Sequence, residues 1–144
     1  MARSPVLLDS SAVFALIEDE AGADRVEEVL REGDALLPWL ALLEVHYITR
    51  QEAGEEEADR RLVLLKGSGC EIVWEVDEAL VLAASALKAE HRLSLADALI
   101  AAYARRRGAV LLHKDPEFEA VAGTVAVEAL PYKSSAEDST LQST

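Results

Sequence analysis

The sequence predicts an α/β protein built around a parallel β-sheet. Residues 6–8 and 109–112 are short apolar runs without polar alternation, which is typical of strands that are buried on both faces of a parallel sheet. Helical stretches separate such runs, as the crossover connections between parallel strands require. The chain has 144 residues, of which 51% are hydrophobic, so it is long enough to bury the core of one domain.

The first half of the chain is predicted to alternate single strands with pairs of helices. Helix-breaking residues mark the boundaries: Gly33 ends the second helix, Pro38 ends the second strand and Gly54 separates the next two helices. The expected elements are strand 6–8, helices 12–17 and 21–31, strand 34–38, and helices 39–52 and 55–66.

The second half continues this alternation. Residues 67–69 (Gly-Ser-Gly) form a turn, Asp77 is placed to cap a helix rich in alanine and leucine, and Gly108 follows three arginines that end the next helix. Asp115 and Pro116 are a favourable N-cap and first-turn pair. The expected elements are strand 71–74, helices 78–90 and 94–107, strand 109–112, a short helix ending at residue 121, and strand 124–128. In helix 94–107 the bulky stripe is expected to comprise Leu95, Leu99, Ile100 and Tyr103.

Composition limits the possible classes of function. The net charge of −13 argues against a general nucleic-acid coat protein, but not against an enzyme that acts on nucleic acid through a divalent metal. No apolar run approaches the ~20 residues of a membrane span, and the N-terminus lacks the apolar region of a signal peptide, so we expect a cytoplasmic protein with no membrane contact. The single cysteine, Cys70, excludes an internal disulfide and a cysteine-based metal site. We expect one domain over residues 1–132 and a polar, flexible tail over residues 133–144.

Four acidic residues lie at positions that a parallel sheet can bring to the carboxyl ends of its strands. Asp9 and Asp115 follow strands, Glu44 lies on the apolar flank of helix 39–52, and Asp97 lies in the first turn of helix 94–107. Sites in open α/β sheets lie beyond the carboxyl ends of the strands. Clustered carboxylates repel one another unless a cation lies between them, and oxygen ligands without His or Cys select Mg²⁺ or Mn²⁺. Such ions activate water for attack on a phosphodiester.

Each of these positions also has a structural explanation. Glu44 can turn to solvent at the edge of its helix, the spacing of Ser94 and Asp97 matches a capping box, and Asp115 can cap a short helix. Capping and metal binding are compatible at Asp97, because a helix that starts near the strand ends is where a metal cluster would assemble.

Four blocks of sequence carry these acids: residues 6–11 (VLLDSS), 42–45 (LLEV), 95–102 (LADALIAA) and 111–118 (LLHKDPEF). Their order and spacing resemble the four signature blocks of the PIN domain, and in particular the small VapC-type toxins of bacterial and archaeal toxin–antitoxin pairs. The resemblance runs from about residue 5 to residue 130, and its most specific part is the block around Asp97.

The resemblance implies a three-layer α/β/α sandwich with a central, mainly parallel sheet. It also implies a Mg²⁺- or Mn²⁺-dependent ribonuclease that cuts structured RNA. By the family pattern the acidic site is formed by Asp9, Glu44, Asp97 and Asp115, and Ser11 orients Asp9 by a hydrogen bond. We expect Asp9 and Asp97 to anchor the main ion, with Glu44 and Asp115 assisting or holding a second one. The implied partners are RNA, a VapB-like antitoxin whose tail lies across the site, and a second copy of the chain in a homodimer.

One position departs from the family pattern. The family usually has Thr or Ser two residues before the fourth acid, where this chain has His113. We expect His113 to support the metal ligands rather than to ligate, because imidazole is a poor ligand for Mg²⁺. It could donate a hydrogen bond, titrate near neutral pH or weaken a second metal position. The departure leaves open a PIN-like protein-binding module with weakened catalysis.

Two other enzyme classes fit less well. A phosphatase of the haloacid-dehalogenase type needs a second Asp where Ser11 stands, and a receiver-type phosphoacceptor needs paired acids as well as a strand-end lysine, which only Lys114 resembles. Arg105, Arg106 and Lys114 are candidate RNA contacts, although arginines before Gly108 also suit the end of a helix.

Overall fold

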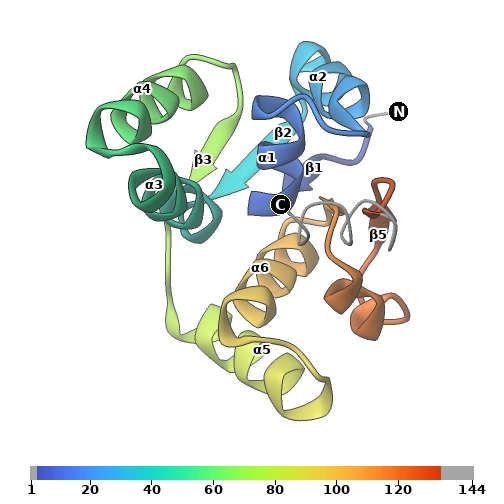
Figure 1. The fold of residues 1–144 in the computed structure, drawn as a ribbon. Helices are drawn as coiled ribbons and strands as arrows, with labels where there is room; N and C mark the ends of the chain where they lie inside the picture. Colours follow the sequence, from blue (N-terminus) through green and yellow to red (C-terminus); the bar gives the residue numbers. More distant parts are fainter. Residues whose placement is uncertain (1–2, 134–144) are drawn as a thin grey trace.

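A five-stranded parallel sheet forms the centre of the molecule (Figure 1). The structure is a computed structural model and describes residues 3–133; apart from Lys133, the expected polar tail lies outside the described residues. The strand order is β3-β2-β1-β4-β5, and every neighbouring pair is parallel. The strands are β1 (Val6–Leu8), β2 (Ala35–Pro38), β3 (Glu71–Val73), β4 (Val110–His113) and β5 (Val127–Ala129).

Helices pack in consecutive pairs around this sheet. Figure 1 shows α2 on one side of the strands and α5 and α6 on the opposite side, so the predicted three-layer α/β/α sandwich is confirmed. The helices are α1 (Ser10–Ile17), α2 (Ala23–Glu32), α3 (Trp39–Ala53), α4 (Glu55–Lys66), α5 (Glu78–Glu90), α6 (Leu95–Arg106) and a short 3₁₀ helix, η1 (Pro116–Val121). Within residues 3–133, no helix combines the length and the apolarity that crossing a bilayer demands.

The core follows from the apolar runs. Leu7 of the central strand pairs with Leu36 of β2 on one side and with Leu111 of β4 on the other. Leu7, Leu111 and Leu112 have no exposed surface, and each fully buried leucine stabilises the fold by roughly 2 kcal/mol. Burial on both sheet faces, predicted from the absence of alternation, is confirmed for β1 and β4.

Several boundaries differ from the prediction by one to three residues, and local hydrogen bonds explain the differences at α1 and β5. Helix α1 begins at Ser10 rather than at residue 12, since Asp9 caps it by accepting the Ala12 N–H. Strand β5 begins at Val127 rather than at residue 124, because the N–H groups of Thr124 and Val125 bond to the Val121 carbonyl and close the turn after η1.

The buried face of α6 also differs from the prediction. Ile100 and Tyr103 are fully buried, but Leu95 is 68% exposed. Positions 95 and 97 point in nearly opposite directions on a helix, about 200° apart. Because Asp97 is buried, with only 8% of its surface exposed, Leu95 is turned to solvent.

Candidate metal centre

The carboxyl ends of β1 and β4 lie side by side and carry the first two acids. The Asp9 N–H donates to the Leu112 carbonyl at 3.3 Å, which joins the two strand ends. Asp9 itself is 3% exposed and caps α1, with its Oδ1 accepting the Ala12 N–H at 2.9 Å. Asp115 follows β4 and caps η1, with its Oδ1 accepting the Glu117 N–H at 3.0 Å.

Ser11 ties these two positions together. Its Oγ lies 2.8 Å from each carboxylate oxygen of Asp9, to which it donates, and it accepts the Lys114 N–H at 2.8 Å. The hydroxyl therefore holds the Asp9 carboxylate from one side and the turn that carries Asp115 from the other.

Helix α6 supplies the third acid, and η1 supplies one that the sequence analysis missed. Ser94 caps α6 and accepts the Asp97 N–H at 3.1 Å. One carboxylate oxygen from each of Asp97, Asp115 and Glu117 lies within 4.8 Å of the others. The sequence pattern that could have indicated Glu117 is its position two residues after Asp115, in the same short helical turn.

Glu44 approaches the site from α3. It is half-buried, and its Oε1 accepts a hydrogen bond from the Ser10 hydroxyl at 3.3 Å. The negative charge of Asp115 is close enough to raise the pKa of Glu44, adding to the larger effect of burial.

The electrostatics of the site disfavour ionised carboxylates in the absence of a cation. Burial, with smaller effects of Asp115 and Glu44, raises the pKa of Asp9 to about 7, although hydrogen bonds from Ala12 and Ser11 act in the opposite direction. Burial and the neighbouring Glu117 raise the pKa of Asp97 to about 8. A positive ion among these oxygens would reverse both effects.

His113 lies behind the turn rather than among the acids. Its ring is fully buried against Phe118, with ring centres 5.1 Å apart, and Nδ1 accepts the Asp115 N–H at 3.2 Å. Burial lowers the pKa of His113, so the ring is neutral at pH 7 and carries its proton on Nε2. In this state the ring accepts a hydrogen bond from the backbone of the turn that carries Asp115.

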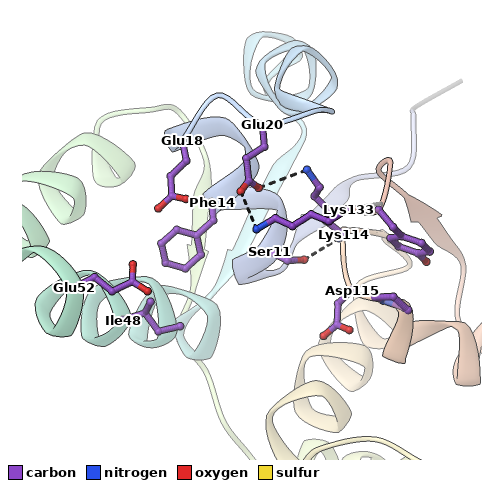
Figure 2. A pocket seen from close by; sticks show the side chains of 11 residues that line it. Ser11, Phe14, Glu18, Glu20, Ile48, Glu52, Lys114, Asp115 and Lys133 are labelled. Carbon is purple, nitrogen blue, oxygen red and sulfur yellow. Dashed lines mark hydrogen bonds and ion pairs between the residues drawn. The ribbon is translucent and has the colours of Figure 1, made fainter. Parts of the chain in front are cut away.

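A groove of about 500 Å³ opens beside the acids (Figure 2). Its walls combine apolar side chains of α1 and α3, including Phe14 and Ile48, with carboxylates. Figure 2 shows Glu52 on α3, Glu18 directly after the end of α1, and Glu20 paired with Lys114 and Lys133.

The three basic residues predicted to contact RNA lie in different environments. The Lys114 side chain is 6% exposed and its ammonium bonds to the Ala21 carbonyl at 3.0 Å. Arg106 forms a paired contact with Asp77. Arg105 is exposed on α6.

A family model describes most of this chain. The model of the PIN domain matches residues 6–124, which include all four predicted acids and Glu117. The chain belongs to the PIN-domain family. Among curated protein sequences, none matches it.

Solved PIN-domain structures share the fold at low sequence identity. A DNA-bound VapBC complex from Salmonella typhimurium is 21% identical with a TM-score of 0.70, over 88% of this chain and 98% of that chain. VapC20 from Mycobacterium tuberculosis, described as a toxin that cleaves the sarcin–ricin loop, is 18% identical with a TM-score of 0.68, over 88% and 99%. A toxin–antitoxin complex from Klebsiella pneumoniae is 19% identical with a TM-score of 0.66, over 89% and 99%.

The acidic residues of this PIN domain fit a hard divalent cation. The three side chains of the cluster, Asp97, Asp115 and Glu117, offer carboxylate oxygen, which suits Mg²⁺ or Mn²⁺. Burial and mutual repulsion raise the pKa values of Asp9 and Asp97, as expected for ligands whose counter-charge is a bound ion.

Proposed function

We propose that this chain is a divalent-metal-dependent endoribonuclease and the toxin of a toxin–antitoxin pair. One observation carries the proposal: carboxylates of α6, η1 and the end of β4 have oxygens within 4.8 Å of one another, next to the buried Asp9. Membership of the PIN family and structural likeness to a toxin described as cleaving RNA support it.

The four predicted acids, Asp9, Glu44, Asp97 and Asp115, would hold Mg²⁺ or Mn²⁺, with Asp9 and Asp97 anchoring the main ion. When bound, the ion supplies positive charge that polarises a phosphodiester and lowers the pKa of water. Ser11 orients the Asp9 carboxylate, and the hydrogen bond from Ala12 fixes one of its oxygens. No nucleophilic side chain is needed for hydrolysis.

The groove is proposed to receive the tail of a VapB-like antitoxin. Its apolar walls and the carboxylates of Glu18 and Glu52 suit an amphipathic segment that carries Arg or Lys, and Asp115 lines the same groove. Several structural neighbours are toxin–antitoxin complexes, which supports a partner of this class.

We also propose that the chain forms a homodimer and is located in the cytoplasm. A homodimer would cover apolar side chains such as Val81 and Leu82 of α5, which are 51% and 61% exposed. Light scattering of the purified chain tests this state. Cleavage of cellular RNA would place the protein in the cytoplasm.

The first experiment is calorimetric titration of Mn²⁺ and Mg²⁺ into the purified protein and into Asp97→Asn. The wild type is expected to bind, and the variant to lose binding and RNA cleavage while keeping its fold, because the amide removes one anionic ligand. Cleavage by the folded Asp97→Asn variant would show that Asp97 is wrongly assigned. Absence of binding in the wild type would refute a metal-dependent nuclease.

A second candidate function is a PIN-like module that binds a protein partner and has weak catalysis. The observation that favours it is His113, which stands where the family usually has a hydroxyl and turns its ring into the core. A chain that binds its antitoxin tightly but leaves RNA intact in Mn²⁺ would favour this module over the nuclease.

A further inference from the structure

The N-terminus of α6 carries a capping box that is shared between two elements. In an ordinary capping box the side chain of the third helical residue accepts the N–H of the N-cap residue. Here Ser94 Oγ accepts the Asp97 N–H, as in such a box. The Ser94 N–H, however, donates to Oε1 of Glu117 at 2.5 Å. Glu117 of η1 thus occupies the role that Asp97 would have in its own helix.

Because Glu117 accepts the Ser94 N–H, the Asp97 carboxylate has no N–H donor among the described residues. Asp97 is 8% exposed, and within residues 3–133 its carboxylate accepts no bond from an N–H group; its side-chain hydrogen-bonding partner is another acid, Glu117. One oxygen of the Asp97 carboxylate faces Asp115 and Glu117 within 4.8 Å. A buried carboxylate without a donor is unfavourable unless a cation supplies the missing partner.

The position of Glu117 is itself fixed by its neighbours. Its N–H donates to the Asp115 carboxylate at 3.0 Å, and the next residue, Phe118, is fully buried. One short turn therefore places Asp115 at the centre and brings Glu117 against the start of α6.

We infer that Glu117 is a positioning residue of the metal centre: it caps Ser94 in place of Asp97 and so keeps the Asp97 carboxylate free to bind the ion. The part that concerns the ion rests on the proposed function. The cap itself does not, and it is tested without metal.

The cap is tested by hydrogen exchange of the Ser94 amide in the metal-free full chain. In Asp97→Ala the amide is expected to remain as protected as in the wild type, because Glu117 accepts its proton. Adding Glu117→Ala to that variant is expected to raise the exchange rate at least about tenfold, since no acceptor remains. Loss of protection in Asp97→Ala alone, or retained protection in the double variant, would overturn the inference.

The consequence for the ion is tested by Mn²⁺ titration. Glu117→Ala is expected to weaken Mn²⁺ binding by about 10- to 100-fold, the usual effect of removing a residue that orients a ligand. Glu117→Gln keeps an oxygen that accepts the Ser94 N–H, so it is expected to restore most of this affinity. Glu119→Ala removes the same charge from an exposed position of η1 and serves as the matched control with wild-type affinity.

The outcomes separate this inference from the proposed function. If the wild type binds Mn²⁺, Asp97→Asn does not, and Glu117→Ala binds as tightly as the wild type, only the role of Glu117 is overturned. If Glu117→Gln is as weak as Glu117→Ala, Glu117 acts by its charge and not by positioning. If the wild type binds no Mn²⁺, both proposals fail. Melting curves of each variant confirm that the chain is folded.

Discussion

In the metal-free protein, individual acidic residues of the site destabilise the folded state. Asp9 and Asp97 are 3% and 8% exposed and lie near other carboxylates, so their charged forms lack both water and counter-charge. The chain keeps them in place with local hydrogen bonds: Ala12 and Ser11 hold the Asp9 carboxylate, while Ser94 holds the backbone of Asp97. This arrangement is expected where binding requires preformed geometry.

We expect the stability of the metal-free protein to fall as pH rises from about 4 to about 8. The pKa of Asp9 rises from 3.8 to about 7 on folding and that of Asp97 to about 8, so between these values the folded state binds more protons than the unfolded state. The stabilisation is complete below the unfolded pKa and is lost as pH passes the folded pKa. Melting temperatures measured from pH 5 to pH 8 without metal test this.

The matched variant for this pH effect is Asp97→Asn, which cannot ionise. Its stability is expected to depend less on pH, and at pH 8 it should exceed the wild type by about 1–2 kcal/mol. All other acids titrate in both proteins, so the difference between the two isolates the contribution of Asp97. Parallel melting curves for the two proteins would contradict the assignment.

Ser11 is expected to contribute both to Mn²⁺ affinity and to the stability of the fold. Ser11→Ala removes a donor to Asp9 and leaves the Lys114 N–H without its acceptor. We expect Mn²⁺ affinity to fall about tenfold and stability by about 1–2 kcal/mol. Ser11→Thr keeps the hydroxyl and should retain most of both; unchanged Mn²⁺ binding in Ser11→Ala would argue against an orienting role.

Among the elements, α6 does most to place the site. It carries Asp97 in its first turn and is buried over most of its length by small residues: Ala98, Ala101 and Ala104 have no exposed surface. Ala101 and Ala104 follow Asp97 by four and seven residues and therefore share its face of the helix, and burial of this face holds Asp97 near the end of β4.

Enlarging this face should displace the helix. Ala101→Leu is expected to destabilise the fold by about 1–3 kcal/mol, because the packed interior has no room for three more carbon atoms. Ala86→Leu makes the same change at an exposed position of α5 and is expected to have little effect. Chemical denaturation of both variants measures the difference, and equal stabilities would mean that α6 can move away from its neighbours without cost.

At the scale of the whole molecule, charge is the dominant property. The chain has a net charge of −13, so RNA would meet repulsion over most of the surface. If the chain cleaves RNA as proposed, binding would depend on the ion and on a few basic groups. Of the three arginines at the end of α6, Arg106 pairs with Asp77 and Arg107 with Glu71 and Glu75, whereas Arg105 forms no ion pair with residues 3–133.

We therefore expect Arg105 to be the arginine of this cluster that contacts a phosphate. In the Asp97→Asn background, which prevents cleavage, Arg105→Ala should reduce the slope of log binding constant against log salt by about 1. Arg107→Ala is the control, because Arg107 is already paired. An unchanged slope in Arg105→Ala would exclude the contact.

The helices and strands, and the positions of the acids along them, are predictable from the amino-acid sequence. Apolar runs without alternation predicted the parallel strands, and Asp77 and Asp115 were identified as caps, because these features depend on residues within one or two turns. That Asp9 and Asp115 would lie at one sheet edge also followed, since β1 and β4 are parallel and end on the same side.

Which side chains are in contact depends on how the elements pack against one another. The exposure of Leu95, the hydrogen bond from Ser10 to Glu44 and the cap that Glu117 provides for Ser94 join residues of different elements or depend on the face that packing buries. The clearest example is the pair Ser94 and Asp97, whose spacing predicts a complete capping box within the helix. In the structure the Ser94 N–H donates instead to Glu117, which lies 23 positions along the chain. Local spacing sets which partners are possible, whereas packing between elements selects among them.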